Sequence, residues 1–179
     1  ASLFYASPTQ INYVMPLGTA TGTAIVTVVR DSAIIAGGIV EVTSVSPSIF
    51  TATSTGSGLA ASQIFRIKAN GEESFEPIVR FDPGQDAFVA IPIDLGPPTD
   101  QVFLVLYVTG LRFRSSQAAV SVTIGSTPGE VNFADAAPGY IGLDQVNVRL
   151  SRALIGSGEL NVALSADGKA ANVVLINIL

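Results

Sequence analysis

The sequence predicts an all-β protein, and three observations support this fold class. Runs of β-branched and aromatic residues recur along the chain, separated by clusters of Gly, Pro, Asp and Ser, which is the pattern of strands joined by turns. No window keeps the 3.6-residue period of an amphipathic helix, and the helical candidates are as short as residues 151–154. Finally, two hairpin-like stretches of the chain are copies of one another.

The first hairpin-like stretch lies near the N-terminus. Residues 23–29, TAIVTVV, form a β-branched run, and residues 33–42 form a second apolar run. The polar residues Arg30, Asp31 and Ser32 separate the two. Because short polar segments between strand-like runs are typical of tight turns, we expect a hairpin here.

The middle of the chain has a different composition. A stretch rich in Gly and Ser precedes two strand-like runs, at residues 63–68 and 87–93, and Pro97-Pro98 closes the segment. Because Pro cannot donate a hydrogen bond to a strand ladder, these prolines and Pro92 favour an edge strand or a connector. We therefore expect residues 53–100 to link two modules and to pack against both.

The C-terminal part carries the clearest strands. Residues 102–108, VFLVLYV, and 119–124, AVSVTI, predict two strands, and the turn residues Asp167-Gly168 predict a second hairpin. Since alternate residues of a strand share a face, one set of side chains is expected to form the core. This set comprises Phe103, Val105, Tyr107, Val120, Val122, Ile124, Leu160, Val162 and Leu164.

The internal repeat divides the chain. Gln10-Ile11-Asn12 recurs as Gln145-Val146-Asn147, and the hairpin after residue 22 recurs after residue 158, an offset of about 135 residues. Two strands precede the second copy, whereas only nine residues precede Gln10. We therefore expect two immunoglobulin-like β-sandwich modules, the N-terminal one incomplete. The expected boundaries are 1–52 for the partial module, 53–100 for the connecting β segment and 101–179 for the complete module.

The composition excludes several functional classes. The chain of 179 residues has 48% hydrophobic and 13% charged residues and a net charge of −5, and its nine Lys and Arg are scattered, so we expect no nucleic-acid partner. It has no Cys and no His, which removes zinc sites, Ser-His-Asp and Cys-His nucleophiles and thiol chemistry. We therefore expect no enzyme activity and no cofactor.

The apolar runs are too short for a membrane span, which needs about 18 residues. No signal peptide is present, and Ala1 is not an initiator Met, so we interpret the chain as a mature secreted protein, located outside the cell or at its surface.

Three blocks of the sequence resemble a known family. Residues 3–12, LFYASPTQIN, residues 106–111, LYVTGL, and residues 142–150, GLDQVNVRL, are similar to the conserved blocks of the Solibacter-type C-terminal domain of secreted acidobacterial proteins. The likeness covers nearly the whole chain, with the blocks in the family's order. It implies a fold related to IPT/TIG immunoglobulin-like domains. Because the family has no characterised activity, the resemblance implies no site residues.

Charged residues offer few candidate sites. Arg112 and Arg114 are two apart, so on a strand they share a face and are candidates to contact an anionic partner, with a solvated strand end as the alternative. The Asp residues lack the i, i+2, i+4 spacing of a calcium loop, so solvated turns are favoured over metal sites. The adjacent Glu72-Glu73 has no aromatic platform nearby, which argues against sugar cleavage.

Two functional hypotheses remain. The first is an extracellular structural protein that self-assembles into a filament or surface layer through β-strand complementation between subunits, since an incomplete sheet invites strand addition. The chain ends supply the candidate donor strands or edges, namely Leu3, Phe4, Tyr5, Val173, Val174, Leu175, Ile176 and Ile178. The alternative is a secreted accessory module that binds carbohydrate or a cell-surface polymer. The absence of Trp and the presence of only four Tyr argue against this alternative.

Overall fold

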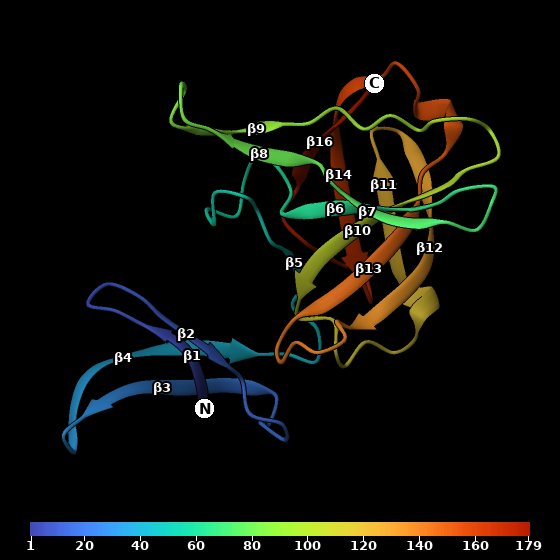
Figure 1. The fold of residues 1–179 in the computed structure, drawn as a ribbon. Coiled ribbons are helices and arrows are strands. Elements are labelled where there is room, and N and C mark those ends of the chain that lie inside the picture. Colours follow the sequence, from blue (N-terminus) through green and yellow to red (C-terminus); the bar gives the residue numbers. More distant parts are fainter. The chain divides into compact units, whose positions relative to one another are not determined.

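The prediction of an all-β class is confirmed by the computed structural model, which describes residues 1–179 (Figure 1). All of its sheets are antiparallel, and the only helical turns are the 3₁₀ turns η1 (Gln117–Ala119) and η2 (Arg152–Leu154). The turn η2 lies within residues 151–154, the short segment expected to be helical. The chain divides into two units, Ala1–Ser44 (unit 1) and Val45–Leu179 (unit 2). The division therefore comes eight residues before the boundary expected after residue 52.

Unit 1 consists of two separate hairpins. The first pairs two short strands that enclose a Ser-Pro turn, and the second pairs two long strands. The strands are β1 (Ser2–Ala6), β2 (Ile11–Val14), β3 (Gly22–Arg30) and β4 (Ala33–Val42). The expected hairpin of residues 23–42 is thus present.

Unit 2 contains the remaining twelve strands. They are β5 (Ser48–Ile49), β6 (Ser62–Ile67), β7 (Glu73–Pro77), β8 (Val79–Asp82), β9 (Ala87–Ala90), β10 (Gln101–Thr109), β11 (Val120–Ile124), β12 (Thr127–Ala136), β13 (Asp144–Arg149), β14 (Gly158–Ala166), β15 (Lys169–Ala170) and β16 (Val174–Ile178). Ten of these strands form one continuous sheet, while β8 and β9 form a separate hairpin.

The large sheet folds over into a sandwich because β12 belongs to both of its layers. The start of β12 pairs with β11, which continues to β14 and β16, and the rest of β12 pairs with β13, which continues to β10, β6 and β7. The apolar side chains between the layers form a single core, to which unit 1 contributes no residue. Unit 2 therefore has the core that an independently folding domain needs.

The segment expected to connect two modules is instead part of unit 2. Strand β6 pairs with β10 over six residues and with β7 on its other edge, so residues 62–67 lie inside the large sheet. Its Arg66 is only 7% exposed, since its side chain pairs with Glu76 and Asp100. The Pro and Gly residues that suggested a connector lie in the loops on either side of these strands.

The expected register of β10 is wrong at all three positions. Val102, Leu104, Leu106 and Val108 face the core and are buried, whereas Phe103, Val105 and Tyr107 lie on the outer face of the sheet, where Val105 is buried and the two aromatic residues are half-buried. Both alternating sets of this strand are apolar, so its sequence carries no period of two. The core positions expected in β11 and β14 are correct: Val120, Val122, Ile124, Val162 and Leu164 are buried, and Leu160 packs against the core.

Strand β16 is held at both edges. Strand β14 pairs with it from Gly158–Ile178 to Val162–Val174. On the opposite edge, Ala60 donates to Leu175 O at 3.0 Å and Ile93 donates to Asn177 O at 2.9 Å, in two parallel bridges.

Candidate functional site

The first hairpin of unit 1 reproduces a strand pair of unit 2. In unit 1, Ala6 lies opposite Ile11 and Tyr5 opposite Asn12. In unit 2, β12 pairs with β13 in the same way, with Ala134 opposite Val146 and Phe133 opposite Asn147. Both pairs then shift register by one residue, at Phe4 in β1 and at Asn132 in β12. The same bulge at the same place shows that the repeat extends to backbone geometry.

The Gln and Asn residues of the repeated triplet make the same contact in both copies. Gln10 Nε2 donates to Asn12 Oδ1 at 2.7 Å, and Gln145 Nε2 donates to Asn147 Oδ1 at 2.8 Å. Because the Gln amide donates to the Asn amide along one strand face, this contact gives the triplet a structural role in both copies.

The second hairpin of unit 1 is repeated as well. Asp31 and Ser32 turn β3 into β4 with positive φ angles of 50° and 66°, and Asp167 and Gly168 turn β14 into β15 with angles of 47° and 76°. The pairing runs from Arg30–Ala33 to Gly22–Val42 in unit 1. The equivalent pairing in unit 2 runs from Ala166–Lys169 to Gly158–Ile178, a constant offset of 136 residues.

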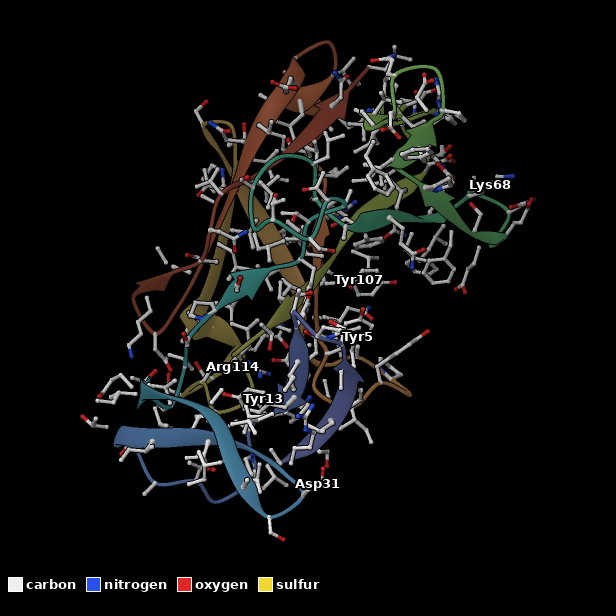
Figure 2. All side chains as sticks on the ribbon, turned by 90° about the vertical axis from the view of Figure 1, so that its left-hand side faces the viewer. Tyr5, Tyr13, Asp31, Lys68, Tyr107 and Arg114 are labelled. Carbon is white, nitrogen blue, oxygen red and sulfur yellow. The ribbon has the colours of Figure 1, made fainter.

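The two units differ in the neighbours of these repeated strands. In unit 2, β13 lies between β12 and β10, and β14 has β11 on the edge opposite β15 and β16. In unit 1, β2 pairs only with β1 and β3 pairs only with β4. Both hairpins of unit 1 therefore have two unpaired edges each, and Figure 2 labels Tyr5 and Tyr13 on the first of them.

The missing neighbours leave apolar side chains of unit 1 partly exposed. No residue of unit 1 is buried, although six of its apolar residues occupy positions that are fully buried in unit 2. In order along unit 1 they are Ile11, Tyr13, Val26, Val28, Val40 and Val42, and their counterparts are Val146, Val148, Val162, Leu164, Ile176 and Ile178. Large residues on the strands are more exposed still, with Leu3 at 61% and Ile25 at 76%. Such surface is uncommon on a monomeric protein.

The two candidate donor segments differ in exposure and in strand pairing. Leu3, Phe4 and Tyr5 lie on β1, whose second edge is open, and all three are more than half exposed. Val174, Ile176 and Ile178 are buried in the core of unit 2, and Leu175 lies between them on β16. Only Val173, which precedes β16, is half exposed. Because β16 is paired on both edges, it would have to leave its own sheet to act as a donor.

The two arginines expected to contact a partner are engaged within unit 2. Arg112 forms an ion pair with the buried Asp144 at 2.9 Å, and Asp144 also accepts from the backbone N–H of Leu111 at 3.0 Å. Arg114 pairs with Asp135 at 3.5 Å. Arg112 and Arg114 follow the end of β10 in a turn, so they do not share a strand face.

A row of aromatic rings, which the sequence did not reveal, crosses the outer face of the large sheet. Phe65 lies between Phe75 and Phe103, with ring centroids 5.0 Å and 6.1 Å away. Phe65 and Phe103 also line a shallow hollow of about 210 Å³ together with Phe133 and the amides Asn132 and Asn147. We call Phe65, Phe75, Phe103 and Phe133 the phenylalanine row.

The same outer face also carries a hydrogen-bonded pair of polar side chains. Gln63 Nε2 donates to the Tyr107 hydroxyl at 2.6 Å on the neighbouring strand. Burial, and secondarily the nearby Tyr140, raises the pKa of Tyr107 above its ordinary value. Tyr107 therefore stays neutral as a hydrogen-bonding group at physiological pH.

The charged residues of a hollow of about 350 Å³ are engaged in internal contacts. Asp100 pairs with Arg66, and Arg152 donates to the carbonyls of Leu95, Gly96 and Pro97. No three Asp or Glu residues gather in a way that would hold a metal ion. No helix is long and apolar enough to cross a bilayer.

Comparison with protein-family models, curated proteins and solved structures finds no match to this chain. The resemblance to the Solibacter-type family therefore stays a prediction from the sequence blocks.

Proposed function

We propose that this chain is an extracellular structural protein that assembles with its neighbours by β-strand addition to unit 1. The observation that carries the proposal is the contrast between equivalent strands. None of the equivalent apolar positions of β2, β3 and β4 is more than partly buried, whereas their counterparts in β13, β14 and β16 are buried between two layers. A strand from a neighbouring subunit would satisfy open backbone groups and cover apolar side chains at once.

The geometry of such a contact favours a polymer. The edges that accept a strand lie in unit 1, whereas unit 2 has its own closed core. The accepting and donating surfaces of a subunit can therefore be different. A contact between two different surfaces repeats from subunit to subunit and gives a filament, or a layer when two edges are used.

Sedimentation velocity over a range of micromolar concentrations tests this function. The whole chain should form oligomers that grow with concentration, and residues 45–179 alone should sediment as a monomer. A whole chain that stays monomeric throughout would contradict the proposal.

A variant pair locates the contact. Lysine at both Leu3 and Tyr5 adds charges to β1 at positions that are already exposed, so it should weaken association without a cost in folding. Lysine at Leu17, which is 82% exposed in the turn before β3, is the matched control and should leave association unchanged. Equal effects of the two changes would show that the contact does not use β1.

The phenylalanine row supports a second candidate function, which is binding of a polysaccharide. Aromatic faces stack on the apolar faces of sugar rings, and the amides of Asn132 and Asn147 offer donors and acceptors for hydroxyl groups. Co-sedimentation with insoluble cellulose and chitin tests this candidate. Changing Phe65 and Phe103 to Ala should abolish binding, whereas Phe113→Ala, an exposed ring outside the row, should not. Absence of binding by the unaltered chain would remove this candidate.

A further inference from the structure

Strand β3 is nine residues long and has an open edge that is covered in unit 2. The repeat offset of 136 residues makes Val26 of β3 equivalent to Val162 of β14, and Val28 likewise corresponds to Leu164. Both positions are buried in unit 2, where β11 pairs with the edge of β14 that corresponds to the open edge of β3. In unit 1 the two valines are only partly covered. Unit 2 therefore shows what kind of strand this edge lacks.

The part of β11 that covers these positions has a short, recognisable pattern. Residues 122–124 of β11 are VTI, and the two apolar residues at its ends lie opposite Leu164 and Val162. Residues 26–28 of β3 itself are VTV, which is again a Thr between two β-branched apolar residues. Since β11 runs antiparallel to β14, a second β3 that runs antiparallel to the first would present the same pattern to the open edge.

A twofold axis at Thr27 generates this arrangement from two copies of the chain. Val26 of one copy then lies opposite Val28 of the second copy, and Thr27 lies opposite Thr27 of the second copy. The edge is self-complementary in this register, which is the condition for a contact between identical surfaces. Strand β3 is free to take this position because its own second edge is unpaired.

The outer face of β3 fits the same register. Ile25 and Val29 point to this face and are 76% and 57% exposed. In unit 2 the corresponding cross-strand pair is Ser121 and Ser165, whose hydroxyl groups hydrogen-bond at 2.8 Å between β11 and β14. In the twofold register Ile25 of each copy lies opposite Val29 of the other. Two apolar cross-strand pairs thus replace the hydroxyl pair, and four exposed aliphatic side chains gain a partner.

The same strand position also touches the first hairpin. In unit 2, β11 lies between β14 and β12, with Val122 opposite Gly129 of β12. The matching registers of β1 with β2 and of β12 with β13 make Ala1 the equivalent of Gly129. A strand in the place of β11 would therefore meet the start of β1 as well as β3, so the contact depends on both hairpins of unit 1.

We propose that two copies of this chain pair through β3, with Val26 opposite Val28, to form a four-stranded β4–β3–β3–β4 sheet. This inference rests on the proposed function, because it names the strand that the open edge of β3 accepts. Residues 22–29 of β3 carry no charge, so the pairing removes no charged group of this segment from water. The contact joins subunits in pairs, and the open edge of β2 remains for the contact that extends the assembly.

Single cysteines test the register, because the chain contains no Cys. Thr27→Cys places two thiols directly opposite each other, at the Cα separation of about 4.5–5.5 Å that an antiparallel pair has and a disulfide can span. Ile25→Cys on the same face is the matched control, since its two thiols would lie four residues apart along the strand, about 14 Å. With glutathione disulfide as the oxidant and micromolar protein, Thr27→Cys should form covalent dimers at least tenfold faster than Ile25→Cys.

A mixed sample tests the same register independently. Chains with Ile25→Cys and chains with Val29→Cys should crosslink to each other, because these positions lie opposite in the proposed pairing, and neither should crosslink efficiently to itself. All three positions are exposed, so the melting temperature of unit 2 should be that of the unaltered chain. Equal rates for Thr27→Cys and Ile25→Cys would overturn the inference, because collisions by chance do not depend on register.

Sedimentation velocity of the reduced chains separates this inference from the proposed function. Oligomers that grow with concentration but form no selective disulfide at Thr27 would overturn the pairing through β3 and leave the proposed function standing. Register-selective disulfides in a chain that sediments no further than a dimer would support the pairing and contradict the filament.

Discussion

Units 1 and 2 contain the same four-strand pattern in two states of completion. The turn of the second hairpin, the bulge in the first hairpin and the Gln–Asn contact form in both, so local sequence is sufficient for them. The apolar side chains are buried only in unit 2, where β10 is the second neighbour of β13 and β11 is the second neighbour of β14. The comparison teaches that turn chemistry and β propensity specify hairpins, whereas a core needs partners that are distant in the sequence.

The largest difference in stability between the two units is expected when Asp replaces Val at equivalent positions of β14 and β3. Val162→Asp puts a carboxylate at a fully buried position and should destabilise unit 2 by more than about 3 kcal/mol, enough to unfold most of it. Val26→Asp at the equivalent, half-exposed position should leave the melting of unit 2 unchanged. Thermal unfolding followed by circular dichroism measures both. If Val162→Asp keeps the wild-type melting temperature, the assignment of the core is wrong.

Removing Ala1 to Ser7 should abolish assembly without affecting unit 2. The deletion eliminates β1 and leaves β2 without its only partner, whereas the core of unit 2 contains no residue of unit 1. Light scattering after size-exclusion chromatography should show loss of oligomers, and the cooperative unfolding of unit 2 should persist. Oligomers of unchanged size would show that the first hairpin takes no part.

Asp144 and Thr9 occupy equivalent positions just before the repeated triplet. Asp144 accepts from Leu111 N–H and pairs with Arg112, both of which follow β10. Asp144→Ala leaves the Leu111 N–H without its acceptor and Arg112 without its carboxylate partner, and should cost about 2–4 kcal/mol. Thr9→Ala has no such partner and should cost less than about 0.5 kcal/mol. Urea unfolding measures both, and Asp144→Asn, which keeps an acceptor, should fall between them.

Acid should weaken unit 2 through a contact that unit 1 lacks. All seven ion pairs lie in unit 2, and a hydrogen bond from the Arg66 guanidinium holds the pKa of Glu76 below its ordinary value despite partial burial. A lowered carboxyl pKa adds stability above the unfolded value of about 4.3, and this stability is lost as the pH falls through the folded value. Urea unfolding at pH 7 and pH 3 should show a smaller pH dependence for Glu76→Gln. An equal dependence would assign the acid effect to other carboxyl groups.

The smallest effects are expected at the equivalent turns. Ser32 has a φ of 66°, which is strained for a residue with a side chain, whereas Gly168 adopts 76° without strain. Ser32→Gly should therefore stabilise the second hairpin of unit 1 by about 1 kcal/mol, seen as slower hydrogen exchange across β3 and β4. The reciprocal change Gly168→Ser should destabilise unit 2 by a similar amount in urea unfolding. Effects of the same sign would show that the turns are not equivalent.

The sequence was sufficient for the features that depend on near neighbours. Asp167-Gly168 predicted its turn, the Val120-Val122-Ile124 alternation predicted its face, and the repeated Gln-Asn triplet predicted the duplication. Strand β10 was harder because every residue from Val102 to Val108 is apolar, so no alternation indicates which side faces the core.

Features that depend on distant pairing were not predictable. Strand β6 looked like a connector because Gly and Pro surround it, and only its ladder with β10 places it inside the sheet. The phenylalanine row forms because β6 brings Phe65 between Phe75 and Phe103. Likewise, the apolar sequence of β16 is equally typical of a donor strand and of a core strand. Its hydrogen bonds to Ala60 and Ile93 show that it is a core strand of unit 2.

The double attachment of β16 determines how unit 2 would carry a mechanical load. Strand β5 joins β10 at the end of β10 that carries Thr109, whereas β16 ends beside Ile93, near the start of β10, so the two ends of unit 2 lie at opposite ends of the sandwich (Figure 1). Tension between Val45 and Leu179 would pull β16 along its own axis. The hydrogen bonds to β14, Ala60 and Ile93 would then be sheared together rather than opened one after another. A module loaded in this way resists stretching through many bonds at once.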